Sequence, residues 1–295
     1  MRDAFGAELD DDAPAGAART GTQAIERSVA ILQQFERAGE AGLTVPDVAA
    51  RTGLTTATAR RMMHTLAAAG LLVRTAPPGT VAPGGSLRTP TSERFQLGIQ
   101  LAILGGLALR RLGFTTALPE LEALAEQTGE AVNLGVLAGQ ESLTVVHLPS
   151  RHALRIESYP GARNPVHVCA MGKALLAVQG VEGLDLDALP RYTDRTKASR
   201  SELLADLELV RGRGYAISDE ERVVGVRAVG APVVLDNGSA IAALAIQGPT
   251  ARLTDERLLE LSDLARTTAD KLASGQFGTL AAVHAGSAWR SILPG

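Results

Sequence analysis

Residues 43–72 read LTVPDVAARTGLTTATARRMMHTLAAAGLL, and this stretch decides the fold of the N-terminal part of the chain. It predicts a short helix that begins after Thr44, whose hydroxyl can cap it. Gly53 supplies the positive φ of a sharp turn, and Thr55 or Thr56 can cap a second helix. Two helices joined by a glycine turn occur both in helix-turn-helix DNA-binding modules and in ordinary helical cores.

The second predicted helix has two different faces. Its apolar positions recur every three or four residues, as expected for a helix that packs on a core, and are Ala59, Met62, Met63, Leu66 and Ala67. The other face carries Thr56, Ala57, Arg60, Arg61 and His64. That polar face could enter a DNA groove, although a solvated surface fits the same spacing.

The flanking segments favour the DNA-binding interpretation. Residues 71–73 predict a short strand, residues 75–92 a loop rich in Pro, Gly, Ser and Thr, and residues 94–98 a second strand. Two strands directly after a recognition helix make a wing. Upstream, a helix is predicted with a core stripe of Ile25, Val29, Ile31, Leu32 and Phe35. Together these elements predict a winged helix-turn-helix over residues 22–98.

Charge is unevenly distributed along the chain. Residues 22–98 carry eight arginines, no lysine and five acidic residues, whereas the whole chain has a net charge of −3. A basic module on an acidic chain indicates that one part alone contacts phosphate.

Composition predicts a soluble protein of two domains. The chain has 295 residues, of which 45% are hydrophobic and 21% charged, and no apolar run is long enough to span a membrane. Residues 1–21 lack the apolar core of a signal peptide and are predicted to be a disordered tail. The single cysteine, Cys169, excludes an internal disulfide framework. We therefore expect a cytoplasmic protein.

The rest of the chain predicts a connecting helix and an α+β domain. Residues 99–113 are apolar around the pair Gly105-Gly106, and residues 275–295 have no clear period and read as a loose tail. Within residues 114–274 the expected helices are 118–127, 170–179, 201–212 and 254–273, and the expected strands are 131–137, 143–148, 223–234 and 240–246. Asn237 and Gly238, which both accept positive φ, predict a hairpin turn, so the sheet is mainly antiparallel.

Five segments carry a resemblance to a known family. They are GLTTATARRMMHTLAAAGLL, FQLG, YPGARNPVHVCAMGKALLA, YTDRTKASRSELLADLELVRGRGYAISDEERVVGVRAVGAPVV and IAALAIQGPTARLT. In this order they resemble the IclR-type transcriptional regulators across residues 22–274. The resemblance implies a winged helix-turn-helix joined to a GAF-like effector-binding domain, with no enzymatic activity and no cofactor. It also implies homodimers or dimers of dimers that bind DNA and are controlled by a small molecule.

Such a dimer would place two recognition helices in successive major grooves of a near-palindromic operator, more often as a repressor. The predicted DNA-contacting residues are Thr44, Thr55, Thr56, Ala57, Thr58, Arg60, Arg61, His64 and Arg94. Arg60, near the helix start, is the candidate for a bidentate contact to guanine. Arg61, Thr44 and the wing are expected to hold phosphates.

A ligand site is predicted where a helix begins at Ala170. The free backbone N–H groups of Ala170, Met171 and Gly172 would point out of that end and attract a carboxylate. In the alternative interpretation Gly172 only permits close packing and Lys173 is solvated. The resemblance implies that Ala170 and Met171 donate the backbone hydrogen bonds that bind small keto acids in family members.

Other family positions depart from the keto-acid pattern. The resemblance brings Cys169, Ser218, Asp219, Ala228, Ala245 and Gln247 into the effector site, where the family pattern has a carboxylate, a thiol and two hydroxyls that this chain replaces. We therefore expect a larger or less polar ligand, a carboxylate with an apolar or aromatic body.

No metal site is predicted. Asp219, Glu220 and Glu221 could be combined with His147, His167 and Cys169, but no spacing such as CxxC or HExxH occurs. A charged turn that pairs with Arg222 or Arg227 explains the acidic run. Two other functions stay open on the sequence: a ligand-independent DNA-binding protein, and a sensor enzyme with a DNA-binding appendage.

Overall fold

The computed structural model describes residues 15–39, 41–75 and 93–285. The chain divides into two compact units, and the boundary along the sequence lies between Gly106 and Leu107. Each unit is described below by itself.

The N-terminal unit contains the predicted helix pair. Its helices are α1 (Ala15–Gln33), α2 (Val45–Thr52) and α3 (Thr56–Ala68), with a 3-10 turn, η1 (Gln34–Arg37), after the first. Thr44 caps α2 in a capping box with Asp47, and Thr55 caps α3. Gly53 has φ +69°, which confirms the sharp turn between them.

A small antiparallel sheet forms the predicted wing. Its strands β1 (Leu43–Thr44), β2 (Leu72–Thr75) and β3 (Arg94–Leu97) lie in the order β1-β3-β2. Phe95 of β3 is fully buried against the helices. The predicted long loop lies outside the described residues, apart from Thr75 at the end of β2.

Only the C-terminal part of the core stripe predicted for the first helix is buried. Ile31 and Phe35 are buried in the core of this unit, but Ile25 and Val29 are 68% and 47% exposed. The reason is that only the C-terminal turns of α1 and the η1 turn reach that core.

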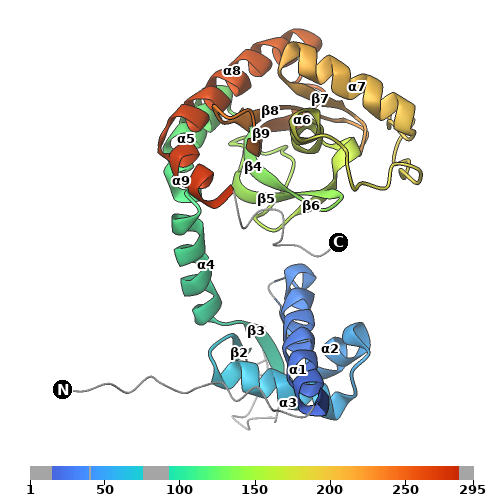
Figure 1. The fold of residues 1–295 in the computed structure, drawn as a ribbon, viewed down its shortest axis with the longest axis vertical. Helices are drawn as coiled ribbons and strands as arrows, with labels where there is room; N and C mark the ends of the chain where they lie inside the picture. The colour runs from blue at the N-terminus through green and yellow to red at the C-terminus, as the bar shows by residue number, and fades with distance from the viewer. Residues whose placement is uncertain (1–14, 40, 76–92, 286–295) are drawn as a thin grey trace, which may run out of the picture. The chain divides into compact units, whose positions relative to one another are not determined.

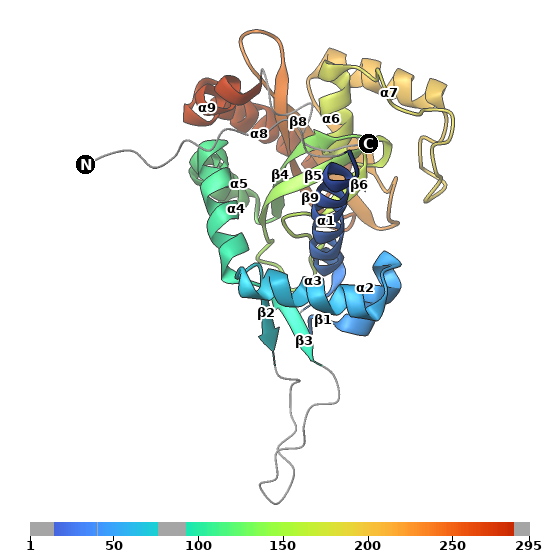
Figure 2. The same cartoon turned by 60° about the horizontal axis from the view of Figure 1, so that its bottom comes forward.

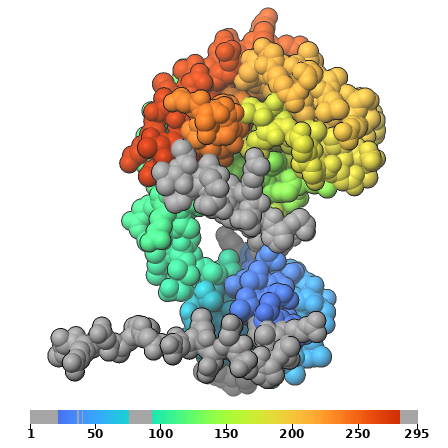
Figure 3. Space-filling model, in the orientation of Figure 1, coloured from blue at the N-terminus to red at the C-terminus, as the bar shows by residue number. Residues whose placement is uncertain are grey.

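The connecting helix is α4 (Ile99–Arg111), and no residue along it is buried. Apolar side chains are nevertheless frequent on it, and Ile99, Ile103, Leu104 and Leu107 are all exposed. Figure 3 shows the open surface of α4 in green. In the described part of the chain no single helix is long and apolar enough to span a membrane, and only the bent pair Ile99–Arg111 and Phe114–Thr128 meets the length and composition criteria together.

The C-terminal unit is built on a six-stranded antiparallel sheet in the order β6-β5-β4-β9-β8-β7. The strands are β4 (Ala131–Ala138), β5 (Glu141–Leu148), β6 (Arg163–Pro165), β7 (Ala216–Asp219), β8 (Val226–Val234) and β9 (Ala240–Pro249). The helices are α5 (Leu118–Thr128), α6 (Ala170–Gln179), α7 (Arg200–Arg213), α8 (Asp255–Ser274) and α9 (Gln276–Ala285), with 3-10 turns η2 (Phe114–Ala117) and η3 (Val166–Val168). The predicted α+β architecture is confirmed.

Helices cover both faces of this sheet. Helices α5, α8 and α9 pack on one face, and α6 packs on the other with α7 beside it (Figures 1 and 2). Each face therefore has its own apolar core. The close approach of α6 to the sheet depends on Gly230 of β8, where an added Cβ would lie 2.9 Å from the carbonyl carbon of Ala170.

Several predictions about this unit are wrong in detail. Residues 276–285 form α9 and not a loose tail, because Phe277 and Ala281 are buried in the core beneath α8. The tail predicted over residues 1–21 is wrong from Ala15 onward, where α1 begins, and residues 1–14 lie outside the described residues. At the β8–β9 turn only Gly238 has positive φ, while the Asn237 side chain accepts hydrogen bonds from Ser239. Strands β6 and β7 were not predicted.

Candidate functional site

The predicted DNA-reading face of α3 is open to solvent. Ala59, Met63 and Leu66 are buried on one side of the helix, whereas Arg60 and Arg61 are exposed on the other. Thr56 and Ala57 are also exposed, and the Thr55 and Thr58 hydroxyls are joined by a hydrogen bond of 2.9 Å. The two predicted faces are therefore confirmed, and the polar one offers two arginines and a run of small residues.

One carboxylate lies among the basic side chains of this surface. Glu93, at the start of the second wing strand, is 3.0 Å from His64 Nε2, 3.3 Å from Arg74 Nη1 and 3.8 Å from Arg60 Nη1. The His64 ring also meets the edge of Phe95. Sequence reasoning did not include Glu93, because its partners come from a different element.

Two predicted DNA contacts have structural roles here. The Thr44 side chain caps α2 and is hydrogen-bonded to Asp47, and Thr44 is only 7% exposed. The hydrogen bonds from Thr44 hold the pKa of Asp47 below its ordinary value. Arg94 donates to the carbonyl oxygens of Ala41 and Gly42. The Thr44 hydroxyl is thus occupied within its own capping box, and the phosphate contact of Thr44 stays a prediction.

A cavity of about 430 Å³ lies in the C-terminal unit where the sheet meets the start of α6. Seven of the predicted effector residues line it, namely Cys169, Ala170, Met171, Ser218, Ala228, Ala245 and Gln247. The structure thus brings together residues that are up to 78 positions apart in the sequence.

The N-terminus of α6 forms one end of the cavity. Cys169 is the N-cap, and its sulfur accepts a hydrogen bond from Gly172 N at 3.3 Å. Within the described chain the backbone N–H groups of Ala170 and Met171 make no hydrogen bond to protein, so they are the free donors of the helix end. Burial raises the pKa of the Cys169 thiol, and the sulfur is therefore a neutral cap at neutral pH.

Two predicted effector residues do not line the cavity. The Gly172 N–H is not free, because it donates to Cys169 Sγ, and an added Cβ would lie 2.5 Å from Val166 Cα, so this glycine serves close packing. Asp219 points to Arg227 and Arg195, and these contacts, first of all the Arg227 hydrogen bond, hold the pKa of Asp219 below its ordinary value. The prediction of Gly172 as a free donor and of Asp219 as a ligand contact is wrong for these geometric reasons.

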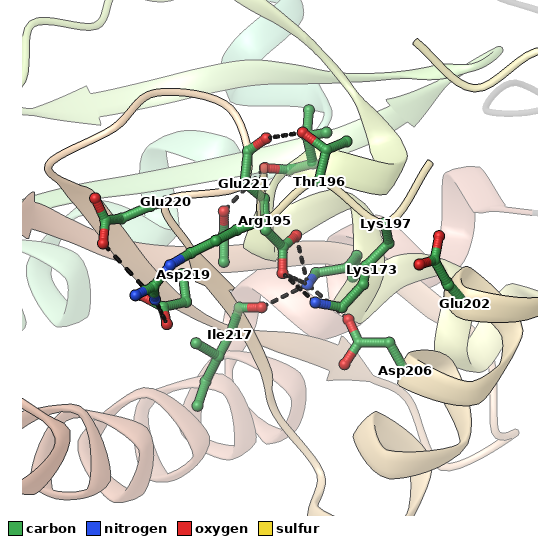
Figure 4. Close-up of polar contacts among 12 residues, drawn as sticks. Lys173, Arg195, Thr196, Lys197, Glu202, Asp206, Ile217, Asp219, Glu220 and Glu221 are labelled. Atoms are coloured by element: carbon green, nitrogen blue, oxygen red, sulfur yellow. Dashed lines mark hydrogen bonds and ion pairs between the residues drawn. The ribbon is translucent and has the colours of Figure 1, made fainter. Parts of the chain in front are cut away.

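The lysine after Gly172 is buried at the centre of an ionic cluster. Lys173 Nζ lies 2.7 Å from Asp206 Oδ2, 2.8 Å from both Glu221 oxygens and 2.5 Å from the Ile217 carbonyl oxygen (Figure 4). The expectation that Lys173 is solvated is wrong, as is the pairing of Glu221 with Arg222 or Arg227. Burial raises the pKa of Glu221 in spite of the opposing effect of Lys173.

Sequence reasoning missed one wall of the cavity. That wall is the segment before and within β6, which contributes Arg155, Ile156, Glu157, Ser158, Tyr159, Ala162, Arg163 and Asn164. Part of this wall is the sequence YPGARNP, which carries part of the family resemblance but whose role in the cavity the sequence does not indicate. Asn133, 2% exposed, also lines the cavity, and its Oδ1 is 2.8 Å from His147 Nδ1.

The histidines near the cavity are engaged by protein groups. His167 Nε2 lies 3.0 Å from the Pro190 carbonyl oxygen, and burial lowers the pKa of both His147 and His167. Among the described residues no group of three or more His, Cys, Asp or Glu side chains could hold a metal ion.

Comparison with known proteins decides the family. The model of the bacterial transcriptional regulator IclR C-terminal domain matches residues 109–274, and the model of the IclR helix-turn-helix domain matches residues 24–76. The chain belongs to the IclR family. Its members are transcriptional regulators, so this chain is a DNA-binding regulator of the IclR type, modulated by a small molecule.

Curated relatives cover most of this IclR-type chain. It is 34% identical over 262 residues to the HTH-type transcriptional regulator BhcR of Paracoccus denitrificans, which covers 86% of this chain and 88% of the relative. It is 30% identical over 262 residues to the HTH-type transcriptional repressor AllR of Escherichia coli K12, with 87% and 91% covered.

Solved structures have the same fold. A putative transcriptional regulator from Rhodococcus sp. RHA1 matches with a TM-score of 0.70 at 29% identity, covering 89% of this chain and 99% of its own. An IclR homologue from Microbacterium hydrocarbonoxydans, complexed with 4-hydroxybenzoate, also has a TM-score of 0.70, at 24% identity and with 88% and 99% covered.

Proposed function

We propose that this IclR-type regulator is a cytoplasmic repressor that binds a near-palindromic operator and responds to a carboxylate with an apolar or aromatic body. The observation that carries the proposal is the cavity at the start of α6, where two free backbone donors face a mixed apolar and polar wall. The named repressor AllR, among its relatives, supports the direction of control.

The DNA-reading part of the proposal rests on α3. Arg60 is 58% exposed and lies in the first half of the helix, where a side chain can reach a base edge. Arg61 and Thr58 flank it and are suited to phosphate contacts, whereas the Thr55 hydroxyl caps α3. His64 and Arg94 are proposed to support this surface through Glu93 and the loop before α2.

The effector part rests on the chemistry of the cavity lining. The N–H groups of Ala170 and Met171 suit the oxygens of a carboxylate, because a helix N-terminus carries partial positive charge. Ala228 and Ala245 leave room for an apolar body, and Gln247 adds an amide. A volume of about 430 Å³ exceeds what a two- or three-carbon keto acid fills.

We also propose that the protein is a homodimer, alone or paired into a tetramer. Ile99, Ile103 and Leu107 recur every four residues on α4 and are 42–73% exposed, with Leu104 beside them. An apolar stripe of this kind is usually covered in solution. A second copy of the same helix has the matching surface.

The DNA proposal is tested by selecting genomic fragments with the purified protein and comparing Arg60→Ala with the parent. The variant should lose affinity for the selected operator by about 1–3 kcal/mol while its binding to random DNA changes little. Thr65→Ala, a substitution at an exposed position nearer the C-terminus of α3, is the control. Equal operator binding by Arg60→Ala and the parent would show that Arg60 does not read bases.

The effector proposal is tested by thermal shift with a panel of carboxylates. The first probe is 4-hydroxybenzoate, which a solved family member binds, followed by benzoate and phenylacetate. A saturable rise of the melting temperature, together with weaker operator binding, is the expected result. No shift with any carboxylate would refute the proposed effector class.

A further inference from the structure

The connection between β7 and β8 is held firmly at its base. Glu221 in this connection is bound by buried Lys173, and its carbonyl oxygen accepts from Thr196 Oγ1 at 2.6 Å. Glu220 has φ +56°, an uncommon backbone conformation for a residue other than glycine, and its carboxylate accepts from Gly225 N at 2.7 Å. The connection is therefore anchored at Glu220 and Glu221, directly before Arg222.

Arg222 follows these two anchored residues and lines the cavity. Among the described residues, the cavity lining includes four charged side chains, and the three other than Arg222 are already paired. Arg155 binds Glu157 at 2.8 Å, and Arg163 lies 3.5 Å from Glu141. Within the part of the chain that the structure describes, Arg222 has no ion pair.

The acidic residues next to Arg222 are engaged elsewhere. Asp219 binds Arg195, and Glu221 belongs to the Lys173 cluster (Figure 4). Asp219 also binds Arg227, and the Glu220 carboxylate accepts from Gly225 N. No carboxylate in its own segment is therefore available to the guanidinium. The cavity retains one uncompensated positive charge.

This charge and the start of α6 act on the same end of the cavity. Arg222 lines the same cavity as Cys169, the N-cap of α6. Burial raises the pKa of the Cys169 thiol, and the Arg222 charge is one of several smaller opposing effects. The free N–H groups of Ala170 and Met171 lie directly after that cap. Apolar side chains complete the lining, among them Ile156, Met171, Val223 and Val226.

We propose that Arg222 is the residue that selects a singly charged carboxylate in this cavity, with the α6 N-terminus as its partner donor. The proposal rests on the effector function proposed above and assigns its charge selection to one side chain. One unpaired guanidinium balances one carboxylate, and the apolar lining contacts the uncharged body. A second negative charge on the ligand would find no partner.

Binding of matched probes to the full-length protein tests this assignment. The parent should bind 4-hydroxybenzoate more tightly than the neutral 4-hydroxybenzamide or the doubly charged isophthalate. Arg222→Gln should weaken 4-hydroxybenzoate binding about 10- to 100-fold, as expected for loss of a charge-assisted hydrogen bond, and should leave 4-hydroxybenzamide binding unchanged. Arg222→Lys should recover part of the loss, because it keeps the charge. Arg195→Gln, with the same charge change outside the cavity, is the control.

The outcomes separate the two proposals. If the parent binds 4-hydroxybenzoate and Arg222→Gln binds it equally well, the role of Arg222 is refuted and the carboxylate site stands. Binding of isophthalate as tight as that of 4-hydroxybenzoate would refute selection for a single charge. If the parent binds none of the carboxylates, the effector proposal fails, and the role of Arg222 fails with it.

A second measurement needs no ligand. Cys169 is the only cysteine of the chain and lines the cavity, so its alkylation rate reports on the local potential. Arg222→Gln should slow alkylation by iodoacetamide at pH 8, whereas Arg195→Gln should not. Equal rates in all three proteins would show that the Arg222 charge does not act inside the cavity.

Discussion

Replacement of Lys173 by methionine should destabilise the C-terminal unit strongly. The ammonium group lies 2.7–2.8 Å from three carboxylate oxygens, and the Lys173, Glu221 and Asp206 side chains are 0%, 4% and 11% exposed. Methionine has a similar length but leaves two carboxylates without a counter-charge. Breaking a buried pair in this way costs about 3–5 kcal/mol.

The destabilisation caused by Lys173→Met should depend on pH in a defined direction. Burial already raises the pKa of Glu221, and removal of Lys173 raises it further. When the pKa of an acid is higher in the folded than in the unfolded protein, the free energy of unfolding falls as the pH rises from the unfolded-state pKa through the folded-state pKa. The loss of free energy of unfolding in Lys173→Met, relative to the parent, should therefore be largest at neutral pH. It should shrink as the pH falls toward the ordinary pKa of a glutamate.

Urea unfolding followed by tyrosine fluorescence measures this unit selectively. The three tyrosines, Tyr159, Tyr192 and Tyr215, all belong to the C-terminal unit. The control is Lys271→Met, whose ammonium group is 61% exposed and 3.8 Å from Glu120, an arrangement that contributes at most about 1 kcal/mol. Equal losses in the two variants, or a Lys173→Met deficit that grows at low pH, would refute the reasoning.

Three smaller predictions follow from the helix ends. Gly172→Ala should lower the free energy of unfolding by about 1–3 kcal/mol, because the new Cβ collides with the Val166 backbone; an unchanged urea midpoint would contradict the packing role. Thr55→Ala should cost about 1 kcal/mol through loss of the α3 cap at Thr58 N, measured by thermal unfolding of the N-terminal unit; a variant as stable as the parent would contradict it. Alkylation of Cys169 should reach its half-maximal rate at a higher pH than that of a free cysteine, because burial raises the thiol pKa; a midpoint below about 8.5 would exclude this environment.

Local patterns in the sequence were sufficient for the helix pair and its caps. The spacing of Ala59, Met63 and Leu66 predicted which face of α3 is buried, since a helix repeats every three or four residues. The bounds of α6 agree with the prediction because Cys169 and Gly180 end the helical pattern at both sides. Such features depend only on neighbours along the chain.

Contacts between distant residues could not be predicted in the same way. Lys173 finds its partners 33 and 48 positions away, so nothing next to it in the sequence indicates that it is buried. Helix α9 was missed because it is anchored by only two buried side chains among its described positions, Phe277 and Ala281. The Arg155–Asn164 wall of the cavity has no periodic pattern, and its role depends on the pairing of β6 with β5.

The carboxylate of Glu93 should change how the affinity for DNA depends on salt concentration. Arg60, His64 and Arg74 already have a negative partner in Glu93. When these side chains meet a DNA phosphate, the negative charge of Glu93 holds or takes up a cation and so offsets part of the release of cations condensed on the DNA. Fewer counterions are then released than the number of basic residues implies. The affinity for DNA should fall less steeply with salt than in a regulator without this glutamate, and a larger share of it should come from the bases themselves.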